Sequence, residues 1–263
     1  MIQDNVRKVF SDIEETCRKI NRNPKDIIVV GVTKTVPMDV IQEAIDAGIR
    51  HIAENRVQEA ENKFPLLMAK NPQIKSHIIG HLQTNKAKDA IRVCSLIQSV
   101  DSFKLAQEIE KQAAKSAKAV EILVQFNTAR EEQKFGALPS DANVLIESIS
   151  RLSLVYIKGL MCMAPLTEDQ GIIRKTFSDL RVIRDGIKAR FAGHHHVDMG
   201  ILSMGMSSDY KIAIEEGSTM VRIGSAIFKT SVIPAQAGIQ RLPKARAPRA
   251  CPGVNAEGRY FEI

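Results

Sequence analysis

The sequence predicts an α/β protein built as a single (β/α)8 TIM barrel, and two observations predict this fold. Between residues 3 and 228, eight short apolar runs of strand composition alternate with stretches of helical periodicity. Such alternation is typical of parallel strands joined by helical crossovers, and eight units usually occupy about 250 residues. A doubly wound sheet is the alternative. Its first strand is usually followed by a glycine-rich loop, whereas Lys34-Thr35-Val36-Pro37 stands there in this chain.

The elements of the first half are marked by their composition and by the residues that end them. Residues 3–20 predict an amphipathic helix with one apolar stripe. The strand after it is rich in β-branched residues, and Pro37 cannot continue its ladder. Gly48 ends the next helix, and Asn71-Pro72 ends the one after that. The strands predicted in this half are 27–34, 51–55, 76–82 and 95–100, and the helices that follow them are 38–47, 57–69, 85–93 and 102–117.

The second half repeats the pattern. Residues 120–127 form a strand rich in apolar residues, and Pro165 ends the strand that follows. The long helix over residues 170–191 has a regular apolar stripe, and Gly217 closes the last helix. The strands predicted here are 120–127, 154–163, 196–204 and 219–225, and the helices are 142–150, 170–191 and 208–216.

Two segments of different character divide the chain. Residues 1–229 predict the barrel domain, whereas residues 230–263 hold four of the ten prolines and show no sustained apolar period. Such a segment cannot bury enough apolar surface to fold, so we expect a poorly ordered, dispensable tail. Its stretch 232–240 resembles the translated product of a dispersed bacterial DNA repeat, which would make the tail an accidental extension.

Composition excludes several function classes. No apolar run approaches the ~20 residues that a membrane helix needs, and the charged first ten residues do not form an export signal. The net charge is +7, but basic and acidic residues are interleaved along the helices, so we expect no nucleic-acid partner. The four cysteines are scattered, which suits free thiols in a reducing compartment. Among the three consecutive histidines at 194–196, neighbouring side chains of an extended segment would point in opposite directions, so we expect no bound metal.

Lys34 and Arg222 are the most informative charged residues. Lys34 ends the apolar first strand, where an idle lysine reaching solvent is one interpretation and a partly desolvated amine suited to Schiff-base chemistry is the other. Alternation in strand eight puts Arg222 on the face of Gly224, pointing into the barrel mouth. A buried guanidinium needs an acceptor, which is either a carboxylate such as Glu54 or a ligand's ring nitrogen or oxyanion.

Small and hydroxyl residues follow strands seven and eight. The active site of a (β/α)8 barrel lies at the carboxyl ends of its strands, and phosphate commonly sits after strands seven and eight. Ser203 lies at the end of strand seven and Ser207 follows it, while Gly224 and Ser225 end strand eight. Each segment alone is also typical of a structural helix cap. Together with the lysine on strand one and the inward arginine, they suggest a site for pyridoxal phosphate, whose ring hydroxyl or imine Asn55 would reach from strand two.

Six segments spread over residues 27–228 carry a family resemblance. They are Val-Gly-Val-Thr-Lys34-Thr, Ala-Glu-Asn55-Arg-Val-Gln-Glu, His-Ile-Ile-Gly-His81-Leu-Gln-Thr-Asn-Lys, Gly-Leu-Met-Cys-Met-Ala-Pro165, Leu-Ser203-Met-Gly-Met-Ser207 and Met-Val-Arg222-Ile-Gly224-Ser-Ala-Ile-Phe. Jointly they resemble the pyridoxal phosphate homeostasis family (YggS/PROSC type), which is related in fold to the N-terminal barrel of alanine racemase.

The resemblance implies a set of roles. It implies pyridoxal 5'-phosphate held as an internal aldimine on Lys34, with Arg222 near the pyridine nitrogen and Asn55 near the ring. The residues that it implies around the phosphate are Ser203, Ser207, Gly224 and Ser225. It further implies a cytoplasmic protein without catalytic turnover that passes the cofactor on to pyridoxal-phosphate-dependent apoenzymes, and we expect a monomer.

An enzyme is the alternative function. A racemase needs a second base opposite Lys34, because it removes a proton from one face and returns one to the other. In relatives of this fold type that base comes from a separate β-domain of the partner subunit, and residues after Phe228 offer only a short Pro-rich segment. A lysine-imine aldolase is a further alternative, but it leaves Arg222 beside a phosphate cradle unexplained.

Overall fold

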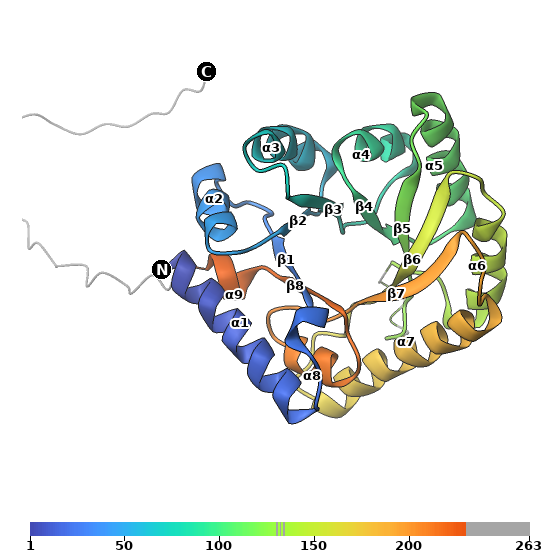
Figure 1. The fold of residues 1–263 in the computed structure, drawn as a ribbon. Helices are drawn as coiled ribbons and strands as arrows, with labels where there is room; N and C mark the ends of the chain where they lie inside the picture. The colour runs from blue at the N-terminus through green and yellow to red at the C-terminus, as the bar shows by residue number, and fades with distance from the viewer. Residues whose placement is uncertain (130, 132, 134, 230–263) are drawn as a thin grey trace, which may run out of the picture. The chain divides into compact units, whose positions relative to one another are not determined.

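The computed structural model describes residues 1–129, 131, 133 and 135–229. In them the eight strands pair in chain order, all parallel, and β8 pairs with β1 to close a barrel (Figure 1). The predicted fold class is therefore confirmed. The strands are β1 (Ile28–Val32), β2 (His51–Glu54), β3 (Lys75–Ile78), β4 (Leu96–Val100), β5 (Val120–Gln125), β6 (Val155–Met161), β7 (Val197–Ser203) and β8 (Met220–Ile223).

Helices form a layer around the strands (Figure 1). The helix before β1 contacts α2, α8 and α9, so it fills the place in this layer between the last and the first strand–helix units. The helices are α1 (Ile2–Lys19), α2 (Met38–Asp46), α3 (Val57–Lys70), α4 (Ala87–Val93), α5 (Phe103–Ser116), α6 (Ala142–Ser150), α7 (Gln170–Arg190), α8 (Tyr210–Glu215) and α9 (Ser225–Phe228).

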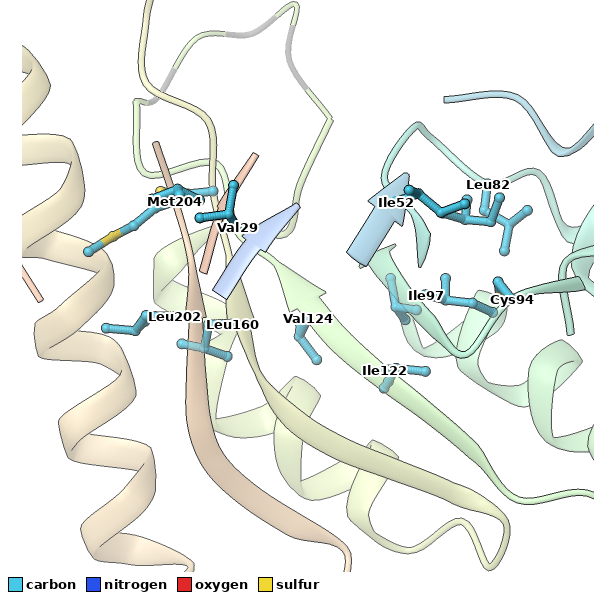
Figure 2. Close-up of a cluster of buried hydrophobic side chains, with 14 of the residues drawn as sticks. Val29, Ile52, Leu82, Cys94, Ile97, Ile122, Val124, Leu160, Leu202 and Met204 are labelled. Atoms are coloured by element: carbon cyan, nitrogen blue, oxygen red, sulfur yellow. The ribbon is translucent and has the colours of Figure 1, made fainter. Parts of the chain in front are cut away.

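Two apolar clusters stabilise the barrel, one on each face of the sheet. Because side chains alternate along a strand, one set points to the helices and the other into the barrel. The outer cluster is the larger, and Figure 2 shows part of it, from Val29 and Ile52 to Leu160 and Leu202. The inner cluster is small and consists of Val30, Ala53, Leu96, Leu123, Met161 and Met220. Polar side chains occupy much of the remaining interior.

All strands except β4 end earlier than the sequence predicted. β1 stops at Val32, so Lys34 lies in the turn after the strand and does not end it. The cause is the backbone of Thr35, whose φ of 60° lies in the left-handed region and breaks the extended conformation. β2 likewise stops at Glu54, which leaves Asn55 in the loop that follows.

The division of the chain into a barrel of residues 1–229 and a tail of residues 230–263 stays a prediction, since the tail lies outside the described residues. Within the described part, no helix combines the length and the apolar character that crossing a bilayer demands.

Candidate binding site at the barrel mouth

The barrel mouth, meaning the carboxyl ends of the strands with the loops after them, brings Lys34 and Arg222 to neighbouring strands. β8 lies beside β1 in parallel register, with Val30 opposite Arg222 and Gly31 opposite Ile223. Lys34 follows in the next turn and is exposed at the mouth. The closure of the barrel therefore joins two residues that are far apart in sequence, as the position of their strands predicted.

Arg222 is buried inside the barrel, with 3% of its surface exposed. Its Nη1 donates to the carbonyl oxygen and to the hydroxyl of Ser203, at 2.7 Å each, and its Nη2 donates to the carbonyl oxygen of Cys162 at 2.8 Å. An ion pair with Glu54, one of the two interpretations of the sequence, is not formed. Glu54 points to the outer face and contacts Thr33. Burial lowers the pKa of Arg222, which nevertheless stays a cation at any physiological pH.

A chain of hydrogen bonds runs from Arg222 across the barrel interior. The Ser203 hydroxyl accepts from Arg222 and donates to Oε1 of Gln98 at 2.6 Å. Nε2 of Gln98 lies 2.9 Å from Nδ1 of His77, and Nε2 of His77 lies 2.9 Å from Nδ1 of His51. An amide nitrogen can only donate, so Nδ1 of His77 accepts and its proton sits on Nε2. Each residue in this series of hydrogen bonds thus donates to the next one farther from Arg222.

The neutral state of His77 has a measurable consequence. Burial, with smaller effects of His51 and Lys75, lowers the pKa of His77 from 6.5 to about 3. Below pH 6.5 His77 is protonated in the unfolded chain but stays neutral in the folded protein. Its contribution to the free energy of unfolding is therefore fully present above pH 6.5 and is lost as the pH falls toward 3. Between pH 6.5 and pH 5 we expect His77 to reduce the free energy of unfolding by about 2 kcal/mol.

Urea unfolding at these two pH values checks this. The variant His77→Gln keeps an acceptor for Gln98 and should lose about 2 kcal/mol less than the wild type on acidification. His195→Gln, which changes an exposed histidine, serves as the control and should follow the wild type. Equal pH dependence of all three proteins would show that His77 is not held neutral.

The loop after β7 and the end of β8 form a cradle of backbone amides around one hydroxyl. Ser207 Oγ accepts from the backbone N–H groups of Gly224 and Ala226, both at 3.2 Å. Gly205 shapes this loop because its φ is 95° and an added Cβ would lie 2.6 Å from Cβ of Ala213. The structure thus brings Ser207 and Gly224 together, as the sequence predicted for a phosphate cradle.

Protein packing does not require a glycine at position 224. A Cβ added there would meet only Val32, at 3.5 Å from its Cβ, so no protein atom demands glycine at this position. Ser225, next in the chain, is exposed. Ser203 is placed differently from the other predicted cradle residues. Its side chain is fully buried beneath Arg222 and its hydroxyl is already bonded, so it contacts the arginine directly.

Asn55 stands at the mouth between β2 and α3 and is exposed. Its backbone is packed against the end of β3, since a Cβ added to Gly80 would collide with the Asn55 carbonyl oxygen. The carbonyl of Gly80 in turn accepts from the Ser99 hydroxyl at 2.6 Å. Asn55 therefore follows β2, the strand that pairs with β1, in a loop whose backbone is fixed against the end of β3.

Sequence reasoning missed part of this site. Gln98 lies within an apolar strand, and its polar side chain in that setting was the available signal that it has a buried partner. Asp209 was also missed. Burial raises its pKa, while a hydrogen bond from the backbone of Met206 and the nearby Arg222 cation oppose that shift. The predicted binding roles of Lys34, Asn55, Ser203, Ser207, Arg222, Gly224 and Ser225 stay predictions.

Comparison with known proteins gives close relatives. The family model described as alanine racemase, N-terminal domain, matches residues 11–232. The pyridoxal phosphate homeostasis protein of Aquifex aeolicus is 37% identical over 225 residues, covering 86% of this chain and 96% of the relative. The protein of the same name from Vibrio alginolyticus is 34% identical over 229 residues, with coverage of 86% and 96%.

Solved structures agree. PipY of Synechococcus elongatus with pyridoxal phosphate bound has 30% identity and a TM-score of 0.75, covering 87% of this chain and 100% of that one. An unknown protein from Bifidobacterium adolescentis has 36% identity and a TM-score of 0.81, with coverage of 86% and 94%. Alanine racemase of Clostridium difficile, at 17% identity and a TM-score of 0.68, shares the fold over 86% of this chain and 57% of its own. The resemblance drawn from the motifs is confirmed: the chain belongs to the family of pyridoxal phosphate homeostasis proteins, built on the alanine racemase N-terminal barrel.

Proposed function

We propose that this protein binds pyridoxal 5'-phosphate at the barrel mouth and serves its intracellular homeostasis as a carrier, without turnover. The observation that carries the proposal is the pairing of β8 with β1, which places Arg222 and Gly224 beside the turn of Lys34. The names of its relatives and the pyridoxal phosphate bound to PipY support the same conclusion.

The residues at the mouth fit the cofactor. The Ser207 hydroxyl accepts from two backbone N–H groups, which fix its position and leave its own O–H to donate to an anion's oxygen. At Gly224 the nearest atoms that a side chain would meet are those of Val32, so the backbone there is open to a ligand. We assign the phosphate to Ser207, Gly224 and Ser225, with Ser203 acting from below. Bound pyridoxal phosphate supplies an aldehyde that condenses reversibly with a primary amine and releases water. Lys34 offers that amine, and Asn55 lies on its side of the mouth.

Arg222 would keep the ring of a bound cofactor weakly electron-withdrawing, which disfavours catalytic turnover. A guanidinium is a donor only and keeps its charge, so a ring nitrogen facing it acts as acceptor and stays unprotonated. An unprotonated ring withdraws electrons weakly. A carrier also needs no second base opposite Lys34, whereas racemisation requires one.

Uptake and delivery test the proposal. The purified protein should take up pyridoxal phosphate in a one-to-one ratio with an absorbance band at the edge of the visible range, which borohydride removes. Mixed with the apo form of a pyridoxal-phosphate-dependent aminotransferase, it should restore that enzyme's activity. Racemisation of L-alanine at enzyme-like rates would instead support the racemase alternative, and failure to take up the cofactor would exclude both. We also infer a monomer located in the cytoplasm; light scattering tests the first inference and cell fractionation the second.

A further inference from the structure

The turn that carries Lys34 is strained. Thr35 is β-branched, yet its φ of 60° lies in the left-handed region, a conformation that side chains of this kind rarely adopt. Within the turn, the Val36 N–H donates to the Thr33 carbonyl at 3.0 Å, and the Thr35 hydroxyl donates to the Lys34 carbonyl at 2.6 Å. Strain of this kind persists only where the surroundings hold it, and it is concentrated at functional sites.

A second lysine, Lys63 on α3, holds this turn from below. Its side chain is only 15% exposed, and its Nζ donates to the carbonyl oxygen of Thr33 at 2.9 Å. The same Nζ contacts Glu54 Oε1 at 2.8 Å and Glu59 Oε2 at 3.1 Å. One partly buried ammonium therefore uses all three donors: one on the backbone just before Lys34 and two on carboxylates.

Each carboxylate also contacts the turn. Glu54 is fully buried, and its Oε1 accepts from the Thr33 hydroxyl at 2.7 Å. Its Oε2 has no hydrogen-bond partner among the described residues, and burial raises its pKa. Glu59 Oε2 accepts from the backbone N–H of Thr35 at 3.2 Å, and this bond lowers the pKa of Glu59.

The contacts differ from those of an ordinary helix ion pair. Lys63 and Glu59 are spaced i, i+4 on α3, a pattern that usually faces solvent and contributes little. Here the pair faces the sheet and bonds to the residues on either side of Lys34, while a buried carboxylate closes the cluster. We propose that three positioning residues hold the turn of Lys34 so that the Lys34 amine faces the cofactor. They are Lys63, Glu54 and Glu59, and we call them the Lys63 clamp.

Amide exchange of the protein without added cofactor tests the clamp by itself. Lys63→Met removes the ammonium at similar length, and Glu59→Ala removes the acceptor of the Thr35 amide at a less buried position. Both should speed exchange of the amides of Thr35 and Val36 about tenfold. The matched control is Lys19→Met, which makes the same change in an exposed i, i+4 pair with Glu15 on α1 and should leave these amides unchanged.

Two ligands separate positioning from general damage to the site. This part rests on the proposed function. Pyridoxine 5'-phosphate has no aldehyde, so it reports on the cradle alone, whereas pyridoxal 5'-phosphate also reports on the bond to Lys34. In both clamp variants we expect wild-type affinity for pyridoxine 5'-phosphate and an about tenfold lower equilibrium constant for covalent attachment, measured from the visible absorbance band.

The outcomes are distinct. Unchanged amide exchange together with unchanged covalent attachment in both variants would overturn the clamp. An equal loss of affinity for both ligands would also overturn it, since that pattern means general disruption of the site. If the wild type binds neither ligand, the proposed function fails, and the amide exchange alone decides whether Lys63 holds the turn.

Discussion

Replacement of Lys34 by alanine is expected to abolish covalent attachment of pyridoxal phosphate. Lys34 is the exposed lysine that follows β1 at the mouth, next to the end of β8. Without its amine, the visible absorbance band should be absent and borohydride should fix no cofactor to the protein. The phosphate cradle remains in this variant, so the cofactor should still bind, with affinity reduced by about tenfold or more. Absorbance titration and mass spectrometry of the intact protein measure both effects.

Lys158→Ala is the matched control for this experiment. Lys158 lies within β6, where its Nζ contacts Asp198 Oδ2 at 2.7 Å. The hydrogen bond to Asp198 is the main cause that raises the pKa of Lys158. A smaller fraction of the Lys158 side chain is therefore the neutral amine that could attach the cofactor. We expect this variant to bind and attach the cofactor like the wild type. Attachment that survives in Lys34→Ala and disappears in Lys158→Ala would move the reactive amine to β6.

Arg222→Met is expected to be the most destabilising single change in the site. Methionine fills part of the space but cannot donate, so the carbonyl oxygens of Ser203 and Cys162 and the Ser203 hydroxyl lose a buried donor. Loss of these buried donors, together with loss of a cation beside buried Asp209, should lower the free energy of unfolding by about 3 kcal/mol or more. Urea unfolding at neutral pH measures this.

The control for Arg222 is an arginine with charged partners at the surface. Arg174 contacts Glu215 and Glu216 and is 44% exposed, so Arg174→Met should cost less than about 1 kcal/mol. A second readout addresses function: in a folded Arg222→Met protein loaded with cofactor, the absorbance band should shift in position, because the ring loses its charged donor. An unchanged band would place Arg222 away from the ring.

Residues whose positions follow from the order of strands could be predicted from the sequence. Lys34 and Arg222 come together because β1 and β8 are the first and last strands of a closed barrel, and strand alternation alone put Arg222 on its inner face. The acceptor of Arg222 was left open between a carboxylate and a ligand. In the structure its acceptors are the carbonyl and hydroxyl oxygens of Ser203 at the end of β7 and the carbonyl oxygen of Cys162 just after β6, and such positions leave no local signal in the sequence.

Loop conformation was the other gap. The sequence placed Lys34 at the end of a strand, yet the turn begins earlier, because Thr35 adopts a backbone angle that its residue type disfavours. Glu59 on α3, a later element, accepts from the Thr35 backbone N–H, and no pattern within the turn predicts that contact. Glu54 was considered solely as a partner for Arg222, whereas its actual neighbours are Thr33 and Lys63.

The chain of hydrogen bonds inside the barrel provides no continuous path for proton transfer. A relay moves protons through groups that accept on one side as they donate on the other, but Gln98 is an amide in the middle of the chain and does not exchange its protons in this way. A proton taken up by His51 therefore stops before Ser203. Arg222 keeps its charge whatever the protonation state of His51 at the other end of this chain.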